Sequence, residues 1–178
     1  MKKHKIWKLR HWIMLGYAVP VVALILSAGV TVVHVRQLAT TFEEVKRSRE
    51  IKENIDHVNL NVQIMSRATR GYLLQRNPTS LLDFNKAKAD YTALIDVLNT
   101  QIQNETQLQN LVEVEALINQ FIDVHQNMIA LVNQNQSQAG VQAWRESNGR
   151  ALNSEIDSLV AAMEQVEDEI VTTDEALQ

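Results

Sequence analysis

The sequence has no cysteine among its 178 residues, and only five glycines, two prolines and three phenylalanines. The absence of cysteine excludes disulfide bonds, thiolate chemistry, cysteine-ligated zinc and c-type haem attachment. Few glycines and prolines, together with apolar residues that recur three and four positions apart, predict an all-α fold. Its stability must therefore come from the packing of helices.

Acidic residues are missing before Glu43, and no charge of either sign occurs from Ile13 to Val33. These 21 residues, as a helix, would span about 31 Å, close to the hydrocarbon thickness of a bilayer, about 30 Å. Five basic residues precede them and favour a cytoplasmic N-terminus. The sequence thus predicts a basic cytoplasmic tail (1–12), a transmembrane helix (13–34) in the inner (plasma) membrane, and a periplasmic or extracellular domain (35–178).

Trp7 and Trp12 lie on the basic side of the predicted span and are expected to anchor it at the membrane interface. The alternative is a cleaved signal peptide, whose apolar region usually covers about 7 to 15 residues. The apolar run here is longer, and Ser27-Ala28-Gly29 matches a cleavage site poorly. Length therefore favours a retained anchor in contact with membrane lipid.

The predicted outer part is acidic. Five of the 17 Lys and Arg residues precede the span, which leaves 12 against all 21 Asp and Glu residues. Nucleic acids and anionic surfaces are bound through clustered Lys and Arg. We therefore expect no nucleic-acid partner.

Four amphipathic helices are expected after the span. The first covers Val35 to Arg76, and Asn77-Pro78 ends it because proline cannot continue a helix. Thr79 or Ser80 would cap the second helix, which ends near Ile102, and a third follows. The fourth would run unbroken from Ala139 to Gln178 with an apolar stripe formed by Leu152, Ile156, Leu159, Met163, Val166, Ile170, Thr173 and Leu177.

The first and last of these helices have 42 and 40 residues, so they would reach equally far. We therefore predict an up-down-up-down four-helix bundle with long first and fourth helices, whose C-terminus returns to the membrane. A chain that ends there would be either a fragment cut before a second span or a single-pass protein.

Motifs for catalysis are absent: the sequence contains neither a glycine-rich phosphate loop nor a nucleophile elbow. We expect no enzyme activity, cofactor or metal. His125 lies in an apolar stripe, where a hydrogen-bonded packing role is favoured over haem or metal binding. The acidic residues near the C-terminus could bind divalent cations, but a solvated helix face is favoured because they lie off the apolar stripe. They are Asp157, Glu164, Glu167, Asp168, Glu169, Asp174 and Glu175.

A basic group lies near the end of the first predicted helix. Arg67, Arg70 and Arg76, with Tyr72 among them, could receive an anionic ligand. Simple solvent exposure would explain the arginines equally well.

The segment from Arg67 to Pro78 resembles the R-G-Y-L-L-T-G-D signature of the third class of CHASE domains, with Gln75-Arg76-Asn77 in place of T-G-D. A second segment, Asn148 to Leu159, is similar to that family's G-(K/R)-x-L-M-D-x-I-x-x-L motif. The resemblance covers most of residues 36 to 178 and implies an extracellular sensory domain of bacterial, notably cyanobacterial, receptors. Such domains usually connect through a second membrane span to a histidine kinase, diguanylate cyclase or chemotaxis region.

Two functions follow as hypotheses. The first is a membrane-anchored sensor for an unknown small-molecule or protein ligand, in which helix shifts cross the membrane. Such a sensor is expected to form a homodimer through a stalk seam of Leu38, Phe42 and Val45. The rival is a single-pass structural or scaffold protein that displays its helices to an envelope partner.

Overall fold

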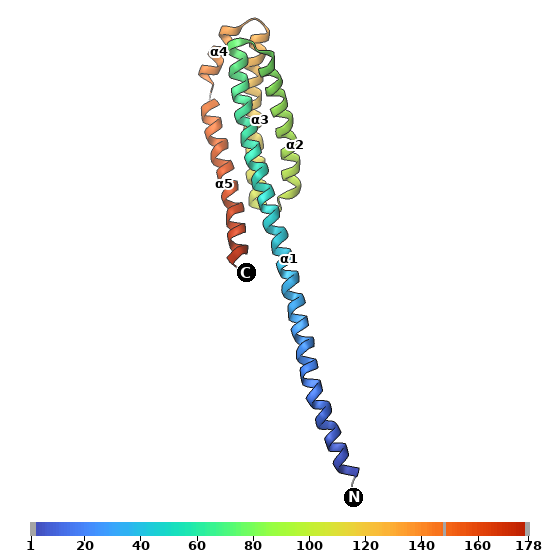
Figure 1. Cartoon of the computed structure of the whole chain (residues 1–178). Coiled ribbons are helices and arrows are strands. Elements are labelled where there is room, and N and C mark those ends of the chain that lie inside the picture. Colours follow the sequence, from blue (N-terminus) through green and yellow to red (C-terminus); the bar gives the residue numbers. More distant parts are fainter. Residues whose placement is uncertain (1–2, 148, 177–178) are drawn as a thin grey trace. The chain divides into compact units, whose positions relative to one another are not determined.

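The fold is all-α in the part of the chain that the structure, a computed structural model, describes: residues 3–147 and 149–176, with side chains of residues 16, 18, 20–147 and 151–172. Five helices and no strand occur there (Figure 1). They are α1 (Lys3–Gln75), α2 (Pro78–Gln101), α3 (Glu105–Asn133), α4 (Ser137–Glu146) and α5 (Gly149–Ala176). The predicted fold class is confirmed in this respect.

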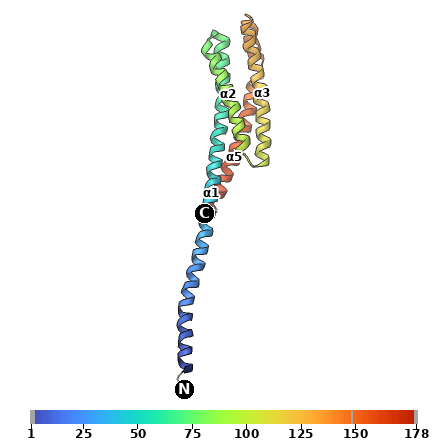
Figure 2. The same cartoon turned by 90° about the vertical axis from the view of Figure 1, so that its right-hand side faces the viewer.

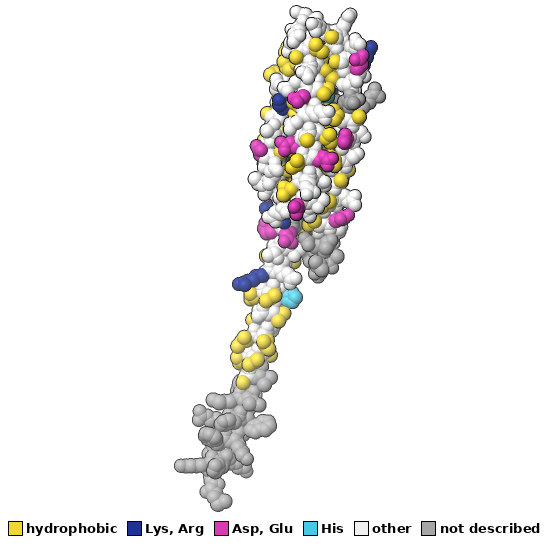
Figure 3. Space-filling model, turned by 180° about the vertical axis from the view of Figure 1, so that it is seen from behind, with side chains coloured by type: hydrophobic (Ala, Val, Ile, Leu, Met, Phe, Trp, Pro, Cys, Tyr) yellow, Lys and Arg dark blue, Asp and Glu magenta, His cyan; other side chains and the backbone are white. Residues whose placement is uncertain are grey.

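The chain divides into two compact units, with the boundary on α1 between Glu44 and Val45. In the first unit, the described apolar side chains from Val21 to Val35 are exposed, and Figure 3 shows them on the surface. This stretch of α1 is long and apolar enough to cross a membrane. The predicted apolar helix near the N-terminus is therefore confirmed, and Pro20 lies within it without ending it.

The second unit has one main hydrophobic core, to which α1, α2, α3 and α5 contribute. These helices lie side by side in both views of the unit (Figures 1 and 2). The buried residues recur at spacings of three and four, as expected for helices that pack lengthwise. The rows include Ile51, Ile55, Val58, Val62 and Met65 on α1; Phe84, Ala87, Tyr91, Ile95 and Leu98 on α2; Leu111, Val114, Ile118 and Phe121 on α3; and Ile156, Val160 and Met163 on α5.

The turn between α1 and α2 follows from three consecutive residues. Arg76 has a left-handed backbone conformation (φ 48°), which ends α1. Asn77 then caps α2, since its side-chain oxygen accepts a hydrogen bond of 3.0 Å from the backbone N–H of Thr79. Pro78 occupies the first turn, where a missing N–H costs nothing. The prediction that Thr79 or Ser80 caps α2 is therefore wrong by two or three residues.

The predicted continuous helix from Ala139 to Gln178 is also wrong. α4 ends at Glu146, and Ser147 has an extended backbone (ψ 143°) before α5 starts at Gly149. The Ser147 hydroxyl donates a hydrogen bond of 2.9 Å to the Trp144 carbonyl. Serine readily bonds nearby backbone groups in this way, which favours leaving the helix. With 28 residues, α5 does not match the predicted length of 40.

Gly140 allows α4 to approach α3 closely. A Cβ atom at this position would lie 3.1 Å from Val132 Cγ2, 3.2 Å from the Met128 carbonyl oxygen and 3.3 Å from Leu73 Cδ2. These three neighbours form a second, small hydrophobic cluster, against which Val141 and Ala143 of α4 pack. Glycine thus lets α4 pack tightly against this end of α1 and α3, because a Cβ atom would push these neighbours back by a few tenths of an ångström.

Candidate functional site

Two of the four predicted ligand-binding residues connect α1 to the turn between α3 and α4. The Tyr72 hydroxyl donates a hydrogen bond of 2.6 Å to Asn133 Oδ1. The Arg76 guanidinium donates to Asn135 Oδ1 at 3.1 Å and to Ser137 Oγ at 2.8 Å. The structure therefore brings Tyr72 and Arg76 together, but as a connection within the protein.

The other two predicted residues, Arg67 and Arg70, are exposed on α1. The guanidinium carbon of Arg70 lies 5.7 Å from the ring centroid of Trp144 on α4, within the range of a cation–π contact. Arg70 thus adds a further connection between α1 and α4. Exposure of both arginines agrees equally with anion binding and with simple solvation.

Two open hollows lie on the surface of the second unit. One, of about 580 Å³, follows α4 and is lined by Ser137, Gln138, Val141, Gln142, Arg145 and Glu146. The other, of about 510 Å³, lies between α1 and α2 and is lined by His57, Leu60, Asn61, Ile64, Asp90, Ala93, Leu94 and Val97. Neither gathers a set of convergent charged groups, so neither defines a ligand by its chemistry.

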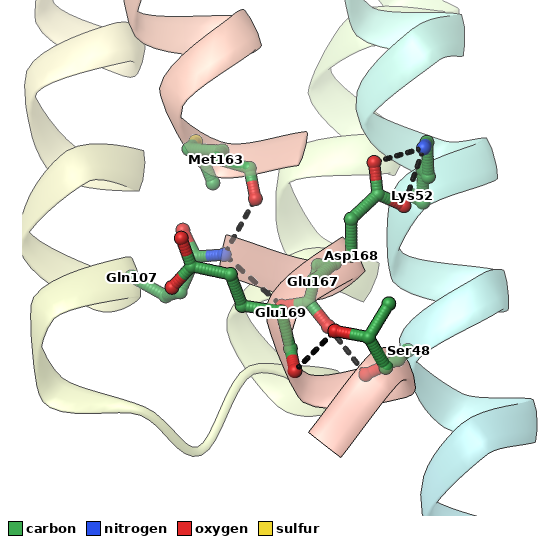
Figure 4. Close-up of polar contacts among 8 residues, drawn as sticks. Ser48, Lys52, Gln107, Met163, Glu167, Asp168 and Glu169 are labelled. Carbon is green, nitrogen blue, oxygen red and sulfur yellow. Dashed lines mark hydrogen bonds and ion pairs between the residues drawn. The ribbon is translucent and has the colours of Figure 1, made fainter. Parts of the chain in front are cut away.

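A buried polar layer made of Ser48, Gln107 and Glu167 is the most distinctive site (Figure 4). Ser48 and Glu167 are each 3% exposed, and Gln107 is 0% exposed. One carboxylate oxygen of Glu167 accepts a hydrogen bond of 2.6 Å from the Ser48 hydroxyl, and the other accepts one of 3.0 Å from the Gln107 amide. Because the three residues come from α1, α3 and α5, one carboxylate joins three helices.

The Gln107 amide nitrogen makes a second contact, a hydrogen bond of 2.8 Å to the Met163 carbonyl oxygen of α5. Gln107 therefore contacts two successive turns of α5. Its own Oε1 atom is buried and has no hydrogen-bond partner among the described residues. A buried acceptor without a partner costs free energy, so the polar layer is held together at some expense of stability.

The polar layer continues on its outer side as a row of charged residues between α1 and α5. Lys52 Nζ lies 2.6 Å and 2.8 Å from the two carboxylate oxygens of Asp168. One turn further, Glu164 of α5 faces Asp56 of α1. Partial burial, and next a hydrogen bond with Asp56, raise the pKa of the Glu164 carboxyl. Contacts between α1 and α5 in this region are thus polar on two consecutive turns.

The interpretation of the acidic stretch as a wholly solvated face is wrong for Glu167, which is in the core. Its position follows from spacing, because Ile156, Val160, Met163 and Glu167 are separated by four, three and four residues. Asp157, Asp168 and Glu169 are exposed and Glu164 is half-buried, while Asp174 and Glu175 lie outside the side chains that the structure describes.

His125 packs inside the second unit, 2% exposed, with Nδ1 at 2.8 Å from the Phe121 carbonyl oxygen. The neutral ring therefore carries its proton on Nδ1, where it can donate to that carbonyl. Burial lowers the pKa of His125. The predicted role as a hydrogen-bonded packing residue is confirmed.

Other sequence-based predictions fall in the first unit or near it. Leu38 and Phe42, two residues of the predicted stalk seam, are 57% and 66% exposed, and Val45 is half-buried. Trp7 and Trp12 lie within α1, but their side chains are outside those that the structure describes. Their proposed role as interface anchors stays a prediction.

No group of three or more His, Asp or Glu residues able to hold a metal ion occurs in the described part of the chain. The polar side chains singled out above connect helices to one another instead of converging on a reactive centre. This arrangement defines the described part of the second unit as an all-α domain whose polar side chains join its helices.

The sequence comparison identifies the class more closely. The CHASE3 domain family matches residues 41–176, which is most of the chain. The chain therefore belongs to the CHASE3 domain family, a family of non-catalytic, extracellular sensory domains of signal-transduction receptors. No curated protein and no solved structure matches the sequence.

The buried histidine predicts a pH dependence of stability. Because the folded-state pKa of His125 lies below its unfolded value of about 6.5, the unfolded chain binds more protons below that pH. The stability contributed by the neutral ring is complete above pH 6.5 and is lost as the pH falls towards the folded-state pKa. In this window we expect His125 to lower the free energy of unfolding of the wild type by about 1 kcal/mol for each pH unit of acidification. We expect His125→Phe to abolish this part of the slope.

Guanidinium unfolding of the full chain at pH 7.5, 6.5, 5.5 and 5.0, followed by circular dichroism, measures this slope. The control is His57→Gln, which removes an exposed histidine of α1 and is expected to keep the wild-type slope. Equal slopes for wild type and His125→Phe would show that His125 does not control the acid response.

Proposed function

We propose that this chain is the membrane-anchored, extracytoplasmic signal-input module of a bacterial signal-transduction receptor. The family supports the sensory role, and the apolar stretch of α1 supports the anchor. The basic residues before that stretch support a cytoplasmic N-terminus and an outer domain over residues 35–178. Any catalytic output would be carried by a region outside these residues.

One observation carries the proposal: α1 runs without a break from Lys3 to Gln75. The same helix contains the apolar stretch and the core row from Ile51 to Met65. A ligand or partner that favours one packing of the core over another would shift the population of the two packings. A helix that belongs to both regions is suited to pass such a shift on as a small piston or rotation.

We infer an up-down-up-down order for α1, α2, α3 and α5 from their contacts. The Asn54 side chain donates a hydrogen bond to the Gln101 side chain, so the last residue of α2 lies beside a point on α1 about 20 residues before the end of α1. The start of α3 contacts the later part of α5 through Gln107 and Glu167. Each pair therefore runs in opposite directions, as in a four-helix bundle.

The proposed topology can be tested with single cysteines, because the natural chain has none. We expect Glu113→Cys, at an exposed position of α3, to react with a membrane-impermeant maleimide in intact spheroplasts. Lys5→Cys is expected to react only after the membrane is permeabilised. The opposite labelling pattern would reverse the topology, and labelling of both only after permeabilisation would contradict an external domain.

A small-molecule input can be tested by thermal unfolding of the full chain in lipid nanodiscs with pools of metabolites. A ligand at 100 times its Kd stabilises the folded state by about 2.7 kcal/mol, which raises the Tm by several degrees. If the ligand is an anion bound at the predicted site, Arg67→Gln with Arg70→Gln would abolish the shift. The control Lys86→Gln, an exposed cation of α2, would retain it. A complete set of pools without any shift would contradict small-molecule sensing.

Dimerisation through the seam of Leu38, Phe42 and Val45 is part of the proposal. Exposure of Leu38 and Phe42 supports it, because a large apolar side chain gains free energy when a partner helix covers it. Sedimentation of the full chain in detergent is expected to show a dimer. The double variant Leu38→Glu, Phe42→Glu is expected to sediment as a monomer. Leu82→Glu, a change at an exposed leucine of α2, is the matched control and should remain dimeric. A monomeric wild type would refute the seam.

A further inference from the structure

The polar layer of Ser48, Gln107 and Glu167 occupies positions where each helix otherwise places apolar residues. Ser48 precedes Ile51 and Ile55 by three and seven residues. Gln107 precedes Leu111, and Glu167 follows Met163, each by four residues. The next residue of the row on every one of these helices is buried and apolar. The polar layer therefore forms one end of a continuous apolar core.

A displacement of α5 along its axis changes the surroundings of Glu167 completely. In the observed register the carboxylate meets the Ser48 hydroxyl at 2.6 Å and the Gln107 amide at 3.0 Å. A shift by one helical turn, about 5.4 Å, towards the core would place the carboxylate level with Ile51 and Leu111. A buried carboxylate without hydrogen-bond donors is strongly unfavourable. The same shift would be far less costly for an apolar residue.

We propose that the polar layer sets the axial register of α5 against α1 and α3, so that α5 slides only after Glu167 has left both Ser48 and Gln107. The layer thus selects one discrete register in place of a continuous range. Gln107 strengthens the selection of this register, because its amide nitrogen bonds the Met163 carbonyl oxygen and the Glu167 carboxylate, which lie one turn apart on α5. A shift of α5 by one turn would break at least one of these hydrogen bonds. A single buried polar residue sets register in the same way in coiled coils.

The unpaired Oε1 atom of Gln107 distinguishes this role from a purely stabilising one. Since that acceptor is buried without a partner, replacing the whole layer by apolar side chains removes an unfavourable group. Apolar replacement of a buried polar cluster is often neutral or stabilising. The proposal therefore predicts that stability and uniqueness of register change in opposite directions.

The test uses the full chain in nanodiscs with spin labels at Asp123→Cys on α3 and Asp157→Cys on α5. Both positions are exposed and separate from the polar layer, and the natural chain has no cysteine to interfere. With the layer intact, we expect pulsed electron–electron double resonance to give one narrow distribution of distances between the two spin labels. In the triple variant Ser48→Ala, Gln107→Leu, Glu167→Leu, we expect a second population from a shift of about 5.4 Å along α5. Its Tm should be equal to or higher than that of the intact layer.

The matched control is Lys52→Met, which removes the exposed ion pair between α1 and α5 next to the layer. It is expected to keep the single distance, and a second population in this variant would assign register to the ion pair instead. A triple variant with one unchanged distance would overturn the proposal.

If the triple variant does not fold, Glu167→Gln provides the same test. It retains the size of the side chain but removes the charge and replaces one of the two accepting oxygens by an NH2 donor. Because one acceptor remains, we expect a smaller second population than in the triple variant. An unchanged distribution in a folded Glu167→Gln would also overturn the proposal. Register selection contributes to signalling only if the proposed input function holds, but the distances are measured without ligand or output region. A failed metabolite or topology experiment therefore does not affect the conclusion on the register of α5. Likewise, a failed distance experiment does not affect the proposed input function.

Discussion

The structure of the second unit depends on the alternation of three- and four-residue spacings along α1, α3 and α5. Burial of apolar side chains at these spacings is the main favourable contribution, because the chain has no cysteine for disulfide bonds and the described residues gather no metal-binding group. The same spacing decides which polar residues enter the core. Ser48, Gln107, His125 and Glu167 are buried because they occupy core positions of their helices.

The buried polar groups have different consequences. His125 Nδ1 bonds the Phe121 carbonyl of its own helix, so this hydrogen bond does not join two helices. Glu167, in contrast, finds its donors only on α1 and α3. A sensory domain needs a core that is stable but has a limited number of alternative packings. A polar layer between three helices serves this need better than a uniformly apolar core, which tolerates sliding.

Much of the fold could be predicted from the sequence, because long amphipathic helices and an uncharged apolar run give strong periodic signals. Predictions failed where a single local interaction decides the outcome. Asn77 caps α2 through its side chain, although Thr79 and Ser80 are also good capping residues. The break after Glu146 depends on Ser147, in a segment with no proline. The charge of Glu167 indicates an exposed residue, whereas its spacing of four residues from Met163 indicates a buried one, and the spacing decides. The contacts of Tyr72 and Arg76 join segments about 60 residues apart, and periodicity within one helix contains no information on such pairs.

The interruption at Ser147 has a consequence for how this domain can vary. In an unbroken helix, inserting one residue rotates every preceding side chain by about 100° relative to the following ones. An extended residue stops this propagation, so the angular phase of α5 is independent of that of α4. Length changes next to Ser147 would leave the α5 row from Ile156 to Glu167 aligned with its neighbours. Within α1, between Ser48 and Met65, the same change would turn part of the row out of the core, and the domain can therefore diverge in length far more easily at one place than at the other.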